Sequence, residues 1–247
     1  YATVIGQMVS FVLFVVFQYT CNREVPAGVR YLVPERKVMK EILSVGFPAI
    51  IMQAVGSFLT YGVNVIFGTL SASAVTAYGV YYKIQQFAFF AAFGMNNAMI
   101  PVIAFNYGSG DKERVRAGIR WGMIDTLVIM GVCLVVLEVC ASQIVGIFAL
   151  TQQTLTLCTR AVRTIALGYL FAGANIAYQG VFQALGRGVP SMVLCLVRQL
   201  LAALPLAWLF TLLPNPEVWC WAAFPVAEGI GLLVALVQRK QILPDVL

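Results

Sequence analysis

Uncharged polar side chains recur at helical spacing within long apolar stretches of this chain, where they could form a binding surface. In a helix that crosses a membrane, a polar face must meet protein or water rather than lipid. Amides together with aromatic rings suit a large amphipathic organic ligand better than a bare ion. Three stretches have such faces, and the candidates for one substrate cavity are Gln53 and Asn64, then Tyr78, Tyr82, Gln85 and Asn96, and then Asn175, Tyr178, Gln179 and Gln183.

Helix packing is the simpler explanation of the same polar residues. Side-chain hydrogen bonds between membrane helices typically contribute less than about 2 kcal/mol each. We favour packing for Ser57 and Thr60, which share a helical face with Gln53. For the amides, packing and ligand binding remain open alternatives.

Ionisable residues are scarcer within the apolar stretches, and an ionisable group inside a membrane is a functional hypothesis by default. Glu228 is the most central carboxylate. If it faces protein, burial favours the neutral acid, which could carry a proton; the alternative is a structural hydrogen bond. Arg198 could instead reach lipid phosphates by snorkelling. The remaining members of this set are Lys83, Asp125 and Glu138.

The residue types disfavour enzyme chemistry. The sequence contains no histidine, which removes HExxH zinc sites and serine–histidine dyads. Neither a GxSxG motif nor a pair of neighbouring intramembrane aspartates is present, and the six cysteines form no CxxC pair. We therefore predict no catalytic residue, no metal site and no cofactor, and interpret the cysteines as packing residues.

The elements that must position these side chains are membrane helices. Hydrophobic residues make up 61% of the 247 and charged residues 11%, and the mean hydropathy is +0.88. These values predict an all-α polytopic membrane bundle, because about 20 apolar residues cross the hydrocarbon core as a helix. The first stretch, 1–19, reads as the end of a helix that begins upstream, so we interpret the chain as a piece of a longer protein. Six further spans are predicted at 43–67, 74–105, 115–141, 155–184, 189–212 and 218–237.

Basic residues lie in alternate loops between these spans. This asymmetry predicts a cytoplasmic position for Lys112, Arg114 and Arg116, for the turn at Arg187 and for the C-terminus. It also accounts for the formal charge of +6 without a nucleic-acid partner, because the basic residues do not form one folded polar face.

The loop NYGSGDKERVRAG, residues 106–118, concentrates charge between two apolar spans. Gly108 and Gly110 are expected to allow a chain reversal with positive φ, and Asp111 is expected to cap the next helix. A phosphate-binding loop is disfavoured, because the spacing GxxxxGK[ST] is missing.

Five motifs carry a resemblance to a known family. KEILSVGFPAIIMQ, AYGVYYKIQQFAF, PVIAFNYGSGDKERVRAG, GVFQALGRGVPSM and ALPLAWLF follow one another between about Lys40 and Lys240. Together they resemble the C-terminal half of multidrug and toxic compound extrusion (MATE) transporters. The amide-rich first span and FQALGR look closer to the bacterial DNA-damage-inducible branch.

This resemblance implies two six-helix lobes that alternate access across the bacterial inner membrane and export cationic or amphipathic organic compounds. Here, 1–20 would end helix six, 21–40 would be the cytoplasmic interlobe linker, 41–240 would be helices seven to twelve, and 241–247 would be a cytoplasmic tail. The implied partners are small organic substrates, membrane lipids and the missing N-terminal lobe.

The resemblance also implies a coupling ion, H⁺ or Na⁺. Members that bind sodium in this lobe have carboxylates at positions that fall near Gly56 and Asn175, neither of which titrates. We therefore expect the ion to bind mainly in the missing half. A lipid-linked oligosaccharide flippase, with a more arginine-rich cavity, is the alternative within the superfamily. A membrane enzyme or passive assembly subunit is the alternative from another class.

Overall fold

The computed structural model describes residues 1–21 and 34–244, which fall into two units, Tyr1–Ser44 and Val45–Leu247. Helix α1 (Ala2–Thr20) in the first unit is apolar and has no buried residue. Most of the predicted linker 21–40 and the end of the predicted tail lie outside the described residues. Helix α2 (Arg36–Gly68) begins within the predicted linker.

The second unit contains the helices that surround the candidate cavity. After α2 come α3 (Ala72–Gly108), α4 (Lys112–Gly146), α5 (Gln152–Ala166) and α6 (Tyr169–Ala184). The chain continues through α7 (Gly188–Leu196), the π-helical η2 (Val197–Ala202) and α8 (Ala203–Phe210). It ends with α9 (Pro216–Trp219), the 3-10 turn η3 (Cys220–Ala222) and α10 (Ala223–Ile242). All these elements are helical, which confirms the predicted fold class.

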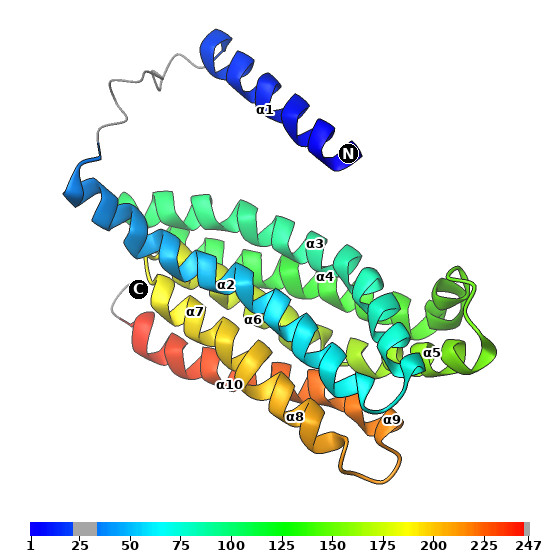
Figure 1. Ribbon diagram of the computed structural model, residues 1–247. Coiled ribbons are helices and arrows are strands. Elements are labelled where there is room, and N and C mark those ends of the chain that lie inside the picture. The colour runs from blue at the N-terminus through cyan, green and yellow to red at the C-terminus, as the bar shows by residue number, and fades with distance from the viewer. Residues whose placement is uncertain (22–33, 245–247) are drawn as a thin grey trace. The chain divides into compact units, whose positions relative to one another are not determined.

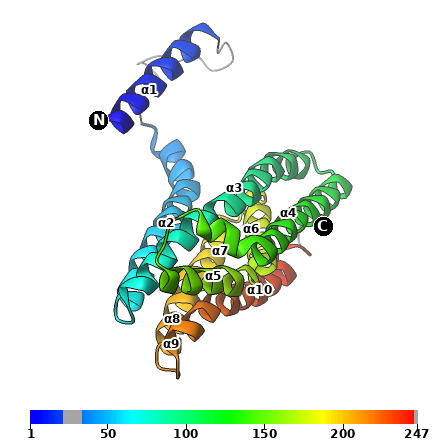
Figure 2. The ribbon, with the colours of Figure 1, turned by 90° about the vertical axis from the view of Figure 1, so that its right-hand side faces the viewer.

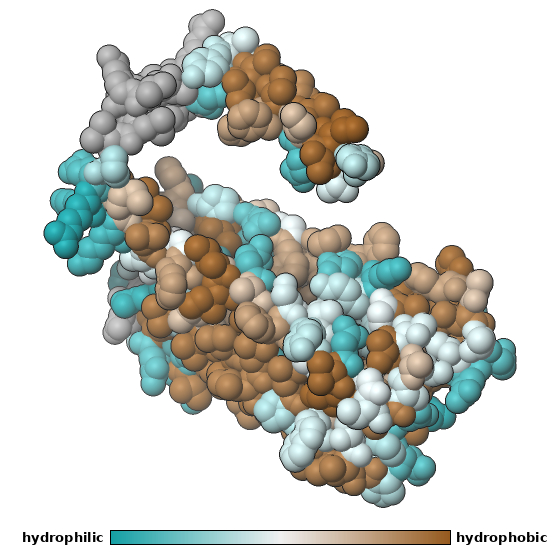
Figure 3. Space-filling view, viewed as in Figure 1, coloured by the Kyte–Doolittle hydropathy of each residue, from teal (hydrophilic) through white to brown (hydrophobic). Residues whose placement is uncertain are grey.

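The helices are long and apolar enough for a membrane bundle. Six helical runs of the described residues pass this criterion: α1, α2, α3, α4, α7 to α8, and α9 to α10. Helices α5 and α6 add a seventh if they are one span, bent by 51°. Exposed apolar side chains, among them Phe87, Phe105 and Val139, give the surface that a lipid environment requires. Figure 3 shows such side chains in brown over much of the visible face of the bundle.

The predicted span 155–184 is not one straight helix. It divides at Leu167 and Gly168, between α5 and α6. A Cβ atom on Gly168 would lie 2.8 Å from the Cα atom of Pro225, so glycine allows the α10 backbone to approach this break. The break therefore depends on a contact between segments far apart in the sequence.

Helix α6 is the centre of the second unit. Figures 1 and 2 show it among α3, α4, α7 and α10, and it contacts all four. Every residue from Ala172 to Phe182 is buried. Small residues such as Gly173, Ala177 and Gly180 let neighbouring helices pack closely, as is typical of membrane bundles.

Charged loops lie together at one end of the bundle. Figure 1 shows the α3–α4 turn, the α6–α7 turn and the end of α10 at the same end, opposite the α2–α3 and α8–α9 connections. In the α3–α4 turn Gly110 has φ +78°, and Asp111 Oδ1 accepts a 3.0 Å hydrogen bond from the Arg114 amide. Both features were predicted, but Gly108 ends α3 and is not at positive φ.

Candidate functional site

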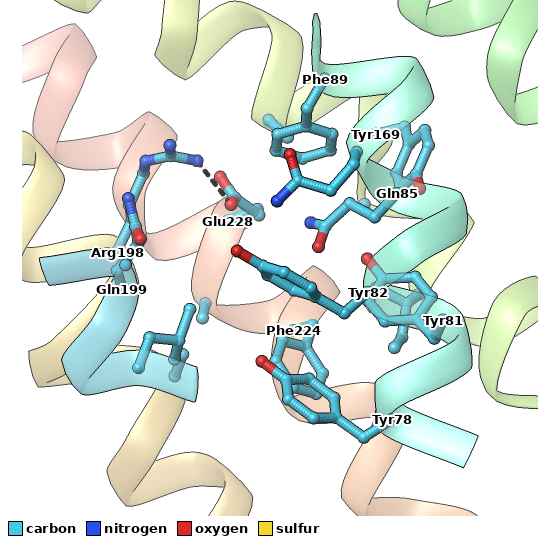
Figure 4. A pocket seen from close by; sticks show the side chains of 18 of the residues that line it. Tyr78, Tyr81, Tyr82, Gln85, Phe89, Tyr169, Arg198, Gln199, Phe224 and Glu228 are labelled. Atoms are coloured by element: carbon cyan, nitrogen blue, oxygen red, sulfur yellow. Dashed lines mark hydrogen bonds and ion pairs between the residues drawn. The ribbon is translucent and has the colours of Figure 1, made fainter. Parts of the chain in front are cut away.

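A pocket of about 300 Å³ lies within the Val45–Leu247 unit. Its wall combines aromatic rings, amides and one pair of opposite charges, supplied by α2, α3, the α5–α6 bend, η2 and α10 (Figure 4). The polar and aromatic lining residues are Gln53, Ser57, Tyr78, Tyr81, Tyr82, Gln85, Gln86, Phe89, Phe93, Tyr169, Arg198, Gln199, Phe224 and Glu228.

Helix α3 supplies most of the aromatic wall, because its ring and amide positions follow helical spacing from Tyr78 to Phe93. The ring of Tyr78 stacks on Phe224 of α10, with centroids 6.0 Å apart and an interplanar angle of 17°. Phe89 meets Tyr169 edge to face at 5.5 Å. These contacts join three helices and fix the rings in geometries that aromatic pairs favour.

A buried ion pair forms another part of the wall. Arg198 Nη1 donates to Glu228 Oε1 at 2.6 Å, and the two side chains are 3% and 17% exposed. Asn175 Nδ2 donates to Glu228 Oε2 at 2.7 Å and to the Glu228 carbonyl at 2.9 Å. Both carboxylate oxygens are therefore occupied from within the protein.

Two backbone features lie next to this ion pair, a π-helical segment and a close approach of α10 at a glycine. Arg198 is the second residue of the π-helical segment η2, and π-helical segments within α-helices occur frequently at functional sites. Gly231 of α10 faces the pair: a Cβ atom there would lie 2.8 Å from Arg198 Cβ and 2.9 Å from Asn175 Nδ2. Glycine thus permits the close approach of α10 to both partners.

The position of Arg198 contradicts the snorkelling prediction. Its guanidinium points into the protein and pairs with Glu228, because a buried carboxylate offers a counter-ion. Glu228 does face protein, as its proton-carrying role requires. Glu228 also accepts hydrogen bonds from Arg198 and Asn175, which are contacts of the kind that the structural alternative expects. The proton-carrying role itself stays a prediction.

Four predicted cavity residues line the pocket: Gln53, Tyr78, Tyr82 and Gln85. Ser57, interpreted as a packing residue, also lines it. Thr60 donates to the Gly56 carbonyl at 2.9 Å, a hydrogen bond within its own helix.

The other candidates lie elsewhere. Asn96, Asn175, Tyr178 and Gln179 are buried in helix packing, and Asn64 is half-buried outside this lining. The Tyr178 hydroxyl accepts from Arg239 at 3.4 Å. Gln183 is exposed and donates to Ser191 Oγ at 3.0 Å. Whether any candidate binds substrate stays a prediction.

Sequence reasoning missed several lining residues. Tyr81, Gln86 and Phe93 extend the helical pattern of α3 and could have been found by continuing it. Tyr169 lies next to the break between α5 and α6, where no helical periodicity carries over. For the ion pair, the available signal was one pair of opposite charges in successive apolar spans.

The sequence of this chain matches a known protein family. The sequence model of the MatE family matches residues 48–209. The chain belongs to the MatE family. This range includes α3 to α7 whole and most of the pocket wall, whereas Phe224 and Glu228 lie beyond it.

Curated relatives of this MatE chain are named as export proteins. It is 25% identical over 196 residues to the multidrug export protein MepA of Staphylococcus haemolyticus, covering 79% of this chain and 43% of that protein. It is 24% identical over 234 residues to MepA of Staphylococcus saprophyticus, covering 95% and 51%. The chain thus spans about half the length of these relatives, which fits the predicted half transporter.

Solved structures share the fold at low sequence identity. A MATE transporter in complex with MaL6 superposes with a TM-score of 0.87 at 19% identity, covering 97% of this chain and 55% of that one. A MOP superfamily transporter from Pyrococcus furiosus, described by a binding pocket of reverse polarity, gives 0.84 at 20% identity, covering 95% and 53%. These structures show the fold. The apolar helices and the family match show an integral membrane protein, and the branch within the family stays a prediction.

Proposed function

We propose that this MatE chain is one lobe of an antiporter that exports amphipathic organic compounds by alternating access. The pocket supports this function best, because aromatic rings and amides offer an amphipathic ligand both apolar contact and hydrogen bonds. The relatives named as multidrug export proteins support the same function. Within the proposal the chain acts in transport and not as an enzyme.

We further propose that H⁺ or Na⁺ drives export and binds mainly in the other lobe. Gly56 lines the pocket without a titratable group, and Asn175 is buried and donates to Glu228. The carboxylate of Glu228 is held by Arg198. These features leave this lobe without an unpaired carboxylate among the described residues that line its pocket.

The proposed orientation places the basic end of the bundle in the cytoplasm, in the inner membrane of a bacterium. Lys112 and Arg114 lie at the start of α4, at the same end of the bundle as Arg239 and Lys240 of α10 (Figure 1). The positive-inside rule then predicts a cytoplasmic C-terminus. A cysteine introduced at Ser109 of the full-length parent should react with a membrane-impermeant maleimide only after the cells are opened.

Efflux by the full-length parent protein tests the proposed function. Expressed in a drug-sensitive bacterial strain, it should raise resistance to amphipathic compounds, and dissipation of the proton or sodium gradient should abolish dye efflux. Normal amounts of parent in the membrane without any change in resistance or efflux would contradict the proposal.

A tryptophan at Gly56 tests whether the pocket is the transport site. A Cβ atom at Gly56 meets no atom within 4 Å, so the new ring should fill the pocket without disturbing the backbone, and efflux should fall by about tenfold or more. Gly79→Trp is the matched control, because Gly79 is equally open, is exposed and lies outside the lining. Equal efflux by both variants would separate transport from this pocket.

A further inference from the structure

The charges of the pocket wall cancel. Among the described residues that line it, Arg198 and Glu228 are the charged ones, and they pair with each other. Lys83, the nearest cation along α3, is exposed and lies outside the lining. The wall that a ligand meets is therefore neutral, although it contains a carboxylate (Figure 4).

A cation entering the pocket must compete with Arg198 for Glu228. The carboxylate is 17% exposed and lines the pocket, so a ligand can reach it. Displacement would leave Arg198, 3% exposed, without its counter-ion, and an isolated buried charge is strongly unfavourable. Its Nε atom already has no hydrogen-bond partner in the structure, so protein atoms offer this group little compensation.

The packing around Arg198 also opposes its movement away from Glu228. Its backbone lies in η2, which contacts α10, and Gly231 lets the two elements approach closely. Asn175 holds the second carboxylate oxygen from α6. The guanidinium on η2 is therefore held by Glu228 of α10, and Asn175 of α6 fixes the position of that carboxylate.

From these contacts we propose that Arg198 is a specificity residue, which occupies Glu228 and directs this wall toward electrically neutral amphipathic compounds and away from permanent cations. This inference rests on the proposed function, since it names the substrate class of the same pocket. Arg198 and Glu228 then set the selectivity together, and removing one should shift it in a direction fixed by the charge that remains.

Two probes of similar shape test the proposal on the purified full-length parent. Methyltriphenylphosphonium is a permanent cation, and triphenylphosphine oxide is neutral. Calorimetric titration gives the ratio of their dissociation constants, and the change of this ratio between variants is the readout, because the other lobe adds its own groups. Arg198→Gln should shift the ratio toward the cation by about tenfold or more, since it exposes the carboxylate to the ligand.

Matched variants distinguish an effect of charge on the binding ratio from a structural effect of the substitution. Arg198→Lys keeps the positive charge and should keep the wild-type ratio. The double variant Arg198→Gln with Glu228→Gln restores a neutral wall and should restore the ratio. Gln85→Glu adds a carboxylate to the lining while the pair stays intact, so it should also favour the cation, even if Arg198→Gln does not fold.

The outcomes distinguish this inference from the proposed function. An unchanged ratio in folded Arg198→Gln, or in Gln85→Glu if Arg198→Gln does not fold, would overturn the inference even if the parent exports both probes. The expected shift in a parent that exports neither probe would support the inference and contradict the proposed function. Failure of both probes to bind the wild type would overturn the inference, because the pocket would not be a ligand site.

Discussion

Within the part of the chain that the structure describes, opposite charges meet at the α3–α4 turn and also inside the bundle. At the turn, Asp111 and Arg114 approach to 3.4 Å, but their side chains are 42% and 75% exposed. In the bundle, Arg198 and Glu228 approach to 2.6 Å with exposures of 3% and 17%. The buried pair is within hydrogen-bond distance and the exposed pair is longer, and the surroundings of the two pairs also differ greatly.

This difference decides what each pair does. Exposed ion pairs typically contribute about 0–1 kcal/mol, because water and salt screen them. Breaking a buried pair by removing one partner typically costs about 3–5 kcal/mol, because the other charge is left uncompensated. The turn contains the densest group of charged residues in the sequence. We nevertheless expect the buried pair to contribute more to stability and to function.

Removing the carboxylate of the buried pair is the strongest test. Glu228→Gln keeps the side-chain shape but leaves the Arg198 guanidinium buried without a counter-ion. We expect a loss of about 3–5 kcal/mol of unfolding free energy, measured by SDS titration in mixed micelles. The double variant with Arg198→Gln should recover much of this loss. A single variant as stable as the wild type would remove the contrast between the two pairs.

Gly231→Ala tests the packing around the buried pair without changing any charge. The added methyl group would lie 2.8 Å from Arg198 Cβ, close to the main chain where little relaxation is possible. We expect a loss of about 1–3 kcal/mol from overpacking. Gly229→Ala on the same helix is the control, because its Cβ atom meets nothing within 4 Å. Equal stability of the two variants would show that α10 can move away from the pair.

Backbone geometry should matter at the turn more than charge does. Gly110 has φ +78°, a conformation that a Cβ atom disfavours. Gly110→Ala should therefore cost about 1 kcal/mol, measured by the same titration. Gly108→Ala lies in α3 at ordinary φ and should be neutral or slightly stabilising. The reverse order of the two variants would contradict this assignment of the turn.

Local sequence signals predicted much of the fold. Hydropathy found the apolar spans, and the glycine and aspartate of the α3–α4 turn predicted its positive φ and its cap. The break before α6 was missed because it depends on Gly168 meeting the Pro225 backbone, which is distant in sequence. The π-helical η2 was missed because its composition resembles that of the flanking helices.

The candidate site was predictable where one helix carries the pattern. Gln53 on α2 and Tyr78, Tyr82 and Gln85 on α3 share helical faces, and all four line the pocket. Periodicity cannot say which faces of different helices meet, so it also selected residues that pack elsewhere. The pairing of the ion pair depends on the rotation of η2 relative to α10, which the packing of the whole lobe determines.

Three variants of the turn separate effects of the smallest expected size, because Asp111 has two roles. Its Oδ1 atom accepts from the Arg114 amide at 3.0 Å, and its other oxygen pairs with the Arg114 side chain. Asp111→Asn keeps a capping oxygen, and Arg114→Ala keeps the cap entirely, so each should cost at most about 0.5 kcal/mol. Asp111→Ala removes the cap and should cost about 1 kcal/mol. If Arg114→Ala proved as costly as Asp111→Ala, the exposed ion pair would contribute as much as the cap. The difference in stability contribution between the exposed and the buried pair would then be smaller than we expect.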